Sequence, residues 1–251
     1  MPTSRQDGAA RSGVIEATWL GRVPYREAWA LQKQLAARRA DGAIGDRLLL
    51  LEHPPVLTLG RHADERHVLG DAAELGRRGI EVIRVERGGE VTYHGPGQLV
   101  AYPILGLADR GLLLRPLVRA LEAAMAETCA AFGVAAGRRD GHPGCWADAV
   151  GPLPRKLGAL GIRVERGVSY HGIALNVAPD LDDFDLIDPC GMPGLVSTSI
   201  AAELRRTGAD ETPATGPDAV ARAGEAFAAR LAGQLDAPLA WDAHPAMAAT
   251  A

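Results

Sequence analysis

The strongest constraint on the fold is a run of three strand-like segments in the middle of the chain, residues 144–150, 156–164 and 168–177. Only short turns that contain glycine or proline separate these segments, so no helix can lie between them. A doubly wound parallel sheet requires strict alternation of strand and helix, and this stretch excludes it. The sequence therefore predicts consecutive strands within a mixed sheet.

Helical and strand-like patterns on both sides of this run complete the expected architecture. Helices are expected at residues 25–40, 72–78, 113–132, 200–206 and 219–235. Further strands are expected at residues 14–20, 47–52, 56–59, 80–85 and 98–105, with a glycine-dense connection between the last two. The expected fold class is α/β of the mixed α+β kind, a mixed β-sheet flanked by helices with a small C-terminal portion. We expect tails without fixed structure at 1–12 and 242–251, and a single domain over 13–241.

Charge, cysteine content and hydropathy exclude several classes of protein. No apolar run reaches the roughly 18 residues that suggest a membrane span, and the polar first residues do not resemble a secretory signal. The formal net charge of −4 gives no general attraction to nucleic acid. The three cysteines share no CxxC spacing, which argues against a disulfide framework and against a thiolate metal site. We therefore expect a cytoplasmic protein with no metal, no membrane contact and no nucleic-acid partner.

Lysine is scarce in this chain: of 27 Lys and Arg residues, only Lys33 and Lys156 are lysines. A GC-rich genome accounts for the arginines, and Lys33 fits the surface of a helix. Lys156 stands in an apolar, glycine-rich segment beside Arg155 and Arg163, where burial and positive neighbours would favour its neutral form. Unlike arginine, a lysine can then give up its proton, although an ordinary strand-end lysine in water fits the pattern as well.

Two further segments could carry chemistry. Residues 87–98 read RGGEVTYHGPGQ, in which paired glycines allow a ligand close to the backbone, Arg87 could hold a carboxylate or phosphate, and His94 could donate to a carbonyl. The segment is neither a dinucleotide fingerprint nor a P-loop, and a structural hairpin remains an alternative. Cys190 lies between a proline and a glycine on an expected turn, where a thiolate could be exposed as a nucleophile. Cys129 and Cys145 lie in core patterns.

Four elements, taken in order, resemble one family, the lipoyl(octanoyl) transferases. They are the RGGEVTYHGPGQ segment at 87–98, a RKLGALGIRV segment at 155–164, HGIALN at 171–176 and PCG at 189–191. The resemblance implies the mixed-sheet fold shared with biotin and lipoate ligases. It also implies the activity of an octanoyl-acyl carrier protein:protein N-octanoyltransferase, an acyltransferase of protein lipoylation that uses a thiol nucleophile. Such an enzyme needs no cofactor and no metal.

The resemblance also implies roles for particular residues. Cys190 would form the acyl-thioester intermediate, and Lys156 would lower the pKa of its thiol and move protons. The implied substrate-binding residues are Arg87, Gly88, Gly89, Glu90, Val91, Thr92, Tyr93, His94, Ala159, Leu160, Gly161, Gly172, Ile173 and Ala174. Leu157, Ile173 and Ala174 are candidates for an apolar slot that holds the acyl chain.

The resemblance implies two kinds of partner: acyl carrier protein, and the lipoyl domains of 2-oxoacid dehydrogenases and of the glycine-cleavage H protein. The protein itself is expected to be a monomer. Because these partners are acidic, we expect arginines to dock them. The candidates are Arg77, Arg78, Arg84, Arg87, Arg138, Arg139 and Arg163. Three alternatives stay open: an ATP-dependent lipoate or biotin protein ligase on the same fold, an amidotransferase between lipoyl-bearing proteins, and a protein that only binds acylated carrier protein.

Overall fold

A computed structural model describes residues 13–188 and 194–242 of the chain. The strands are β1 (Ile15–Arg22), β2 (Asp46–Glu52), β3 (Val56–Leu59), β4 (Glu81–Arg84), β5 (Val91–His94), β6 (Gln98–Ile104), β7 (Gly137–Arg139), β8 (His142–Ala147), β9 (Arg155–Glu165), β10 (Val168–Asn176) and β11 (Leu239–Trp241). The α-helices are α1 (Tyr25–Ala40), α2 (Ala72–Arg77), α3 (Leu114–Ala131), α4 (Ile200–Thr207), α5 (Thr212–Thr215) and α6 (Ala219–Gln234). Two short 3-10 helices are η1 (Glu65–His67) and η2 (Asp182–Leu186).

The large sheet has the strand order β11-β1-β2-β6-β10-β9-β8-β7. Strand β1 is parallel to β11 and to β2, whereas the pairs from β2 through β6, β10, β9 and β8 to β7 are antiparallel. The sheet is therefore mixed, as the consecutive strand patterns predict.

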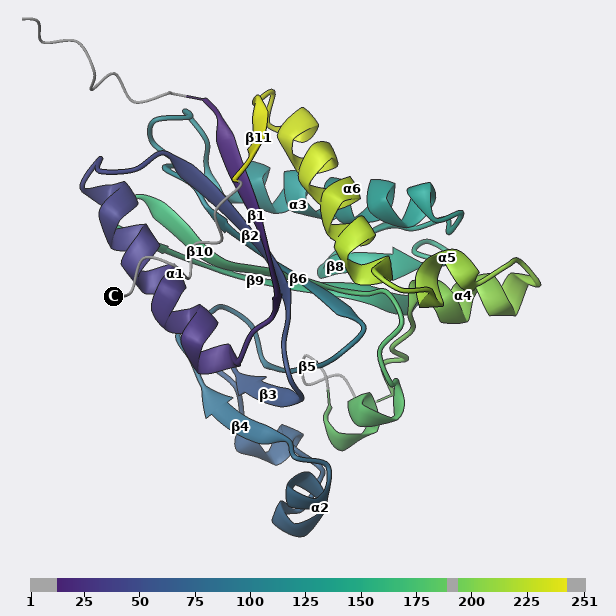
Figure 1. Ribbon diagram of the computed structural model, residues 1–251. Coiled ribbons are helices and arrows are strands. Elements are labelled where there is room, and N and C mark those ends of the chain that lie inside the picture. The colour runs from purple at the N-terminus through teal and green to yellow at the C-terminus, as the bar shows by residue number, and fades with distance from the viewer. Residues whose placement is uncertain (1–12, 189–193, 243–251) are drawn as a thin grey trace, which may run out of the picture.

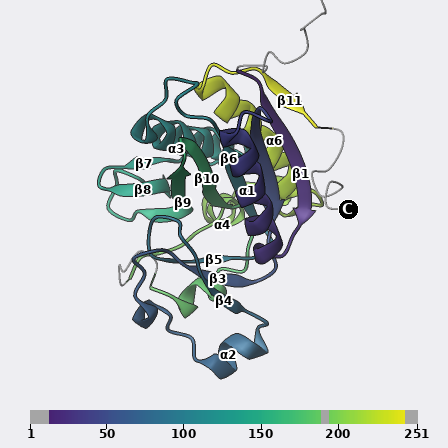
Figure 2. The same ribbon diagram turned by 90° about the vertical axis from the view of Figure 1, so that its left-hand side faces the viewer.

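Helices cover both faces of the large sheet. Helix α1 packs on β6 and β10 from one face, while α3 and α6 lie together on the other (Figures 1 and 2). This arrangement explains the four consecutive leucines of β2. Leu48 and Leu50 face the core under α3 and α6, Leu49 and Leu51 face the core under α1, and all four are fully buried. A strand covered on both faces needs an apolar run and not an alternating pattern.

A tight turn joins β9 to β10 and fixes their register. Arg166 and Gly167 have φ values of 50° and 78°, the left-handed conformation that a two-residue type I′ hairpin requires. From this turn Gly161 pairs with Gly172 and Ala159 with Ala174. The hairpin thereby brings the 155–164 and 171–176 segments side by side.

A smaller sheet of order β4-β3-β5 lies beside the large sheet, next to α2 (Figure 1). The sequence indicates a glycine-dense connection across residues 87–97, but part of this connection is strand β5, which pairs antiparallel with β3. The glycines on both sides of Val91–His94 obscure its apolar and polar alternation. Because β3 holds this strand, its side chains have fixed positions: Val91 and Tyr93 pack in the core of the small sheet, and His94 contacts Gln98 of β6.

The remaining expected elements are found within one to three residues of their expected ends. The three-residue strands β7 and β11 were not expected, because so short a segment carries no readable pattern. In the part of the chain that the structure describes, no helix has the length and hydropathy to cross a bilayer.

Candidate active site

A cavity of about 190 Å³ lies where the β9–β10 hairpin meets β5 and β6, and helix α1 and the 87–92 loop close it. Its lining residues are Tyr25, Arg87, Gly89, Glu90, Val91, Thr92, His94, Gln98, Tyr102, Pro143, Lys156, Gly158, Ala159, Leu160, Gly161, His171, Gly172, Ile173, Ala174, Asn176, Phe184 and Ser197. Residues 158–161 of β9 and 172–174 of β10 form a wall of apolar side chains and glycines, and Lys156, His171 and Asn176 lie at the ends of this wall. The wall from β5 and β6 carries the polar side chains of Thr92, His94 and Gln98.

Most residues that the sequence selects for substrate binding line this cavity. Gly88 and Tyr93 are not among the lining residues. Tyr93 turns to the core of the small sheet, where its ring lies 5.3 Å from that of Phe184. The carbonyl oxygen of Gly88 lies so near Gly161 that a Cβ there would come within 2.7 Å of it. Leu157, a candidate for the acyl slot, lies instead in the main core under α3.

Lys156 begins the β9 wall of the cavity and is 7% exposed. Its Nζ lies 5.2 Å from the centroid of the Trp146 ring. Its backbone is paired with the segment 196–198: the Lys156 N–H donates to the carbonyl of Val196 at 2.8 Å, and the Thr198 N–H donates to the carbonyl of Lys156 at 2.9 Å. Residues that follow the PCG element are thus bound directly to Lys156.

Cys190 lies outside the described residues, but both flanks of its segment are held near the cavity. On one flank the Asp188 N–H donates to the carbonyl of His67 at 2.8 Å, and His67 Nδ1 lies 3.3 Å from the carboxylate of the cavity residue Glu90. On the other flank, segment 196–198 is bound to Lys156. Cys129 and Cys145, by contrast, are fully buried in the main core.

Arg87 and His94 are buried at the polar wall. The Arg87 guanidinium donates to Thr58 through Nη2, at 2.6 Å to the carbonyl and 2.9 Å to Oγ1. Burial, reinforced by the nearby His53 and by the positive charge of Arg87, holds the pKa of His94 well below its usual value, so this imidazole is neutral. His94 Nδ1 lies 2.8 Å from Oε1 of Gln98.

His171 is a cavity residue that the sequence reasoning missed as an individual. It is 1% exposed, and its ring nitrogens have no hydrogen-bond partner among the described residues. Burial lowers its pKa to about 4. Its φ of 56° is a conformation that residues other than glycine seldom adopt within a strand. Gln98 and Asn176 were missed too. Gln98 is the last residue of the 87–98 segment and Asn176 the last residue of the 171–176 segment, but a polar residue at a strand end does not reveal its partner.

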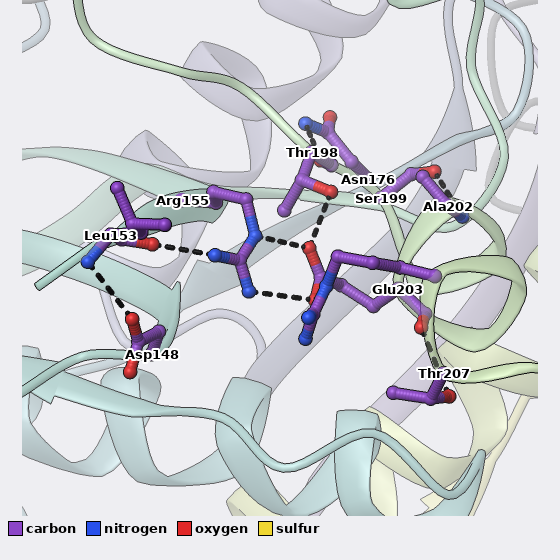
Figure 3. A network of polar contacts seen from close by, with 10 residues as sticks. Asp148, Leu153, Arg155, Asn176, Thr198, Ser199, Ala202, Glu203 and Thr207 are labelled. Carbon is purple, nitrogen blue, oxygen red and sulfur yellow. Dashed lines mark hydrogen bonds and ion pairs between the residues drawn. The ribbon is translucent and has the colours of Figure 1, made fainter. Parts of the chain in front are cut away.

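A buried carboxylate clamps the start of β9 to the segment beside Lys156 (Figure 3). Glu203 accepts from Arg155 Nε at 2.7 Å, from Arg155 Nη2 at 3.0 Å and from the Thr198 hydroxyl at 2.8 Å. Burial alone would raise the pKa of Glu203, but the hydrogen bonds from Arg155, Thr198 and Arg206 outweigh it and hold the pKa at about 2.

This clamp predicts an acid-dependent loss of stability. The folded-state pKa of Glu203 is about 2 against 4.5 for an ordinary glutamate, so its ionised form stabilises the fold above pH 4.5. As pH falls from 4.5 towards 2, about 3 kcal/mol of the free energy of unfolding should be lost. Urea unfolding of Glu203→Gln should show lower stability at pH 7 and a weaker decline down to pH 3. A decline equal to that of the wild type would contradict the assignment.

Most of the arginines considered for partner docking are occupied by acidic neighbours or carbonyls. Arg78 binds Asp183 at 2.9 Å, Arg84 binds Glu65 at 2.8 Å and Arg138 binds Asp140 at 2.9 Å. Arg139 donates to the carbonyl of Ala149. The acidic neighbours therefore offset part of the positive charge of Arg78, Arg84 and Arg138.

Solved structures share this fold. The bipartite lipoate protein ligase of Thermoplasma acidophilum superposes with a TM-score of 0.64 at 15% identity, covering 92% of this chain and 87% of that one. A lipoate-protein ligase A bound with ATP gives a TM-score of 0.63 at 17% identity, covering 90% and 88%. The chain therefore has the fold of the lipoate protein ligases, which confirms the expected fold class.

Sequence relatives narrow this class. The lipoyl protein ligase A/B catalytic domain matches residues 24–213. An octanoyltransferase of Chloroflexus aurantiacus is 47% identical over 214 residues, 84% of this chain and 92% of that protein. An octanoyltransferase of Gloeobacter violaceus is 53% identical over 173 residues, 68% of this chain and 73% of that protein. The chain belongs to the octanoyltransferases of the lipoyl protein ligase A/B catalytic domain family.

Proposed function

We propose that this octanoyltransferase takes the octanoyl group from the thioester of octanoyl-acyl carrier protein and passes it to a lysine of a lipoyl domain, through a thioester on Cys190. The acceptors would be the lipoyl domains of 2-oxoacid dehydrogenases and the glycine-cleavage H protein. The observation that carries this proposal is the position of Lys156: it ends the apolar wall of the cavity and binds the segment that follows Cys190.

The cavity suits a saturated acyl chain. Leu160, Ile173 and Ala174 provide apolar contacts, and the paired glycines Gly161 and Gly172 line the cavity without side chains. A Cβ on Gly172 would come within 1.9 Å of the carbonyl oxygen of Ala101, so this position cannot carry a side chain without moving β6. Burying each CH₂ group of the chain contributes about 0.8 kcal/mol to binding.

The flanks of Cys190 support its role. It follows Asp188 by two residues, and an extended chain advances at most about 3.5 Å per residue. Asp188 is held by His67, whose imidazole contacts the cavity residue Glu90. The two anchored flanks therefore support the proposal that the Cys190 thiol reaches the cavity mouth and Lys156.

Each half-reaction balances as an exchange at one carbonyl carbon. In the first, the Cys190 thiolate attacks the octanoyl thioester; a new C–S bond forms, the bond to phosphopantetheine breaks, and the released thiol takes a proton from Lys156. In the second, the neutral acceptor amine attacks, the Cys190 C–S bond breaks and an amide forms. Lys156 takes the proton that the amine loses. The thioester already carries the acyl group in activated form, so no nucleotide is consumed.

Intact-mass spectrometry without ATP tests this function. After incubation with octanoyl-acyl carrier protein, the protein should gain the mass of one octanoyl group, and peptide mapping should locate it on Cys190. Adding a lipoyl domain should remove this mass and place it on the acceptor lysine. If transfer occurs only with free octanoate and ATP, the proposal fails in favour of an adenylating ligase. Binding of the carrier without any acylation would instead indicate a binding protein.

A further inference from the structure

We propose that a one-directional chain of hydrogen bonds, running from Arg87 to the backbone of Lys156, positions Lys156 and the segment that follows Cys190. Gln98 and Asn176 are the positioning residues of this chain. The inference rests on the proposed function, because it explains how the groups of that mechanism are held. The links of the chain are Arg87, Thr58, His94, Gln98, Asn176, Thr198 and Lys156, each less than a tenth exposed.

The first links join the glycine-rich loop to His94. Arg87 donates to Thr58 Oγ1 through Nε at 3.2 Å and through Nη2 at 2.9 Å. These two bonds occupy the lone pairs of the Thr58 hydroxyl, whose own proton is left to point at His94 Nε2, 3.4 Å away. His94 Nε2 must then be the unprotonated nitrogen of a neutral ring.

The next link fixes the proton of His94 from the other side. The Gln98 amide nitrogen donates to the carbonyl of Tyr93 at 3.1 Å and to Asn176 Oδ1 at 2.9 Å. Its oxygen therefore faces His94 Nδ1 at 2.8 Å, and that nitrogen must carry the proton. Two independent neighbours of His94, Thr58 and Gln98, thus require the same tautomer.

The last links reach Lys156. Because Asn176 Oδ1 accepts from Gln98, its amide nitrogen donates to the carbonyl of Thr198 at 2.9 Å. The Thr198 N–H in turn donates to the carbonyl of Lys156 at 2.9 Å. Every bond from Arg87 onward is donated towards Lys156, so no buried donor or acceptor in the chain meets a partner of its own kind.

This chain of hydrogen bonds joins segments that are far apart in sequence. Asn176 ends β10 and holds Thr198, which lies between the Cys190 segment and helix α4, while Gln98 begins β6 and holds Asn176. Aligned hydrogen bonds in a buried environment strengthen one another, and an unmatched group among them is costly. Reversing one amide should therefore displace segment 196–198, and a displacement of about 1 Å in a catalytic site can cost on the order of 100-fold in rate.

Asn176→Asp tests the direction in which the hydrogen bonds of this chain are donated. An ionised carboxylate still accepts from Gln98 but cannot donate to the carbonyl of Thr198, so kcat should fall about 100-fold while the KM for octanoyl-acyl carrier protein changes little. When protonated, the aspartate again donates to Thr198. The ratio of variant to wild-type kcat should therefore rise as pH falls, whereas Asn176→Leu should show no such rise. The titratable groups near this position are His94, Lys156 and Glu203.

Two measurements separate a positioning role from a purely structural one. The ¹⁵N resonances of His94 in the wild-type protein should show a proton on Nδ1 and none on Nε2 at neutral pH. The opposite tautomer would contradict the proposed direction of the hydrogen bonds. The rate at which iodoacetamide alkylates Cys190 should fall in Asn176→Asp. Ser169→Ala is the matched control, because Ser169 lies on β10 as Asn176 does. Its buried hydroxyl accepts from the N–H of Leu105 and donates to the carbonyl of Pro103, so the substitution should lower stability without changing kcat.

The possible results distinguish this inference from the proposed function. If the wild type acquires octanoyl on Cys190 but Asn176→Asp keeps wild-type kcat at every pH, the positioning chain is wrong and the function stands. If the wild type acquires no octanoyl group, the function itself fails. An equal loss of kcat in Asn176→Asp and Ser169→Ala would also overturn the inference, because it would reflect lost stability alone.

Discussion

Cys190→Ser is expected to abolish octanoyl transfer, lowering kcat on the order of 10⁴-fold or more. A serine hydroxyl is not ionised near neutral pH and is a far weaker nucleophile than a thiolate, so the first acyl exchange fails. The variant should gain no octanoyl mass on incubation with octanoyl-acyl carrier protein, although it should still bind the carrier. Transfer to a lipoyl domain, followed by mass spectrometry of the acceptor, measures the loss.

The other cysteines supply the control for this prediction. Cys145 is fully buried in the main core and does not line the cavity, so Cys145→Ala should retain transfer with a modest loss of stability. If Cys190→Ser still transfers octanoyl at the wild-type rate, the acyl group does not pass through Cys190, and a direct attack by the acceptor amine becomes the better account.

Lys156→Arg is expected to lower kcat about 10³-fold, within the range usual for the loss of a general acid–base group. Arginine keeps the positive charge beside the cavity but cannot release its proton, so it cannot accept the proton of the attacking amine. The charge alone still favours a thiolate. Alkylation of Cys190 by iodoacetamide should therefore remain faster in Lys156→Arg than in Lys156→Met, even though both variants fail to turn over.

Lys33→Arg is the control that this chain offers, since Lys33 is the other lysine of the sequence. It lies exposed on α1 with its Nζ 4.1 Å from the centroid of the Trp29 ring, a contact that an arginine can also make. We expect unchanged kcat in this variant. Wild-type turnover in Lys156→Arg would show that Lys156 acts through charge and not through proton transfer.

Much of the fold was predictable from local patterns. The leucine run of β2 is typical of a buried strand, and α1 and α3 occupy the ranges that helical spacing predicts. The glycine segments indicated that a ligand could approach the backbone, and Gly89, Gly161 and Gly172 line the cavity. Such features are readable because periodicity and glycine content act on neighbouring residues in the chain.

The sequence predicted which residues belong to the candidate site but not which partners they contact. Arg87, His94 and Lys156 stood out as reactive residue types, but their partners lie on other elements. No local pattern indicates that Arg87 binds Thr58 of β3, or that Lys156 pairs with segment 196–198. Strand β5 was missed because glycines on both sides obscure its short pattern, and its pairing with β3 identifies it as a strand.

The amino-acid sequence by itself determined most of the helices and strands, the burial of the leucine run of β2 and the residue types available for acyl transfer. Propensity, periodicity and turn chemistry act over a few residues, so they need no tertiary contact to be read. Only the tertiary structure decided that Arg87, His94, Gln98 and Asn176 lead to Lys156 along one chain of hydrogen bonds. The direction of a buried hydrogen bond depends on which donor meets which acceptor, and that is set by strand pairing between residues as much as 78 positions apart.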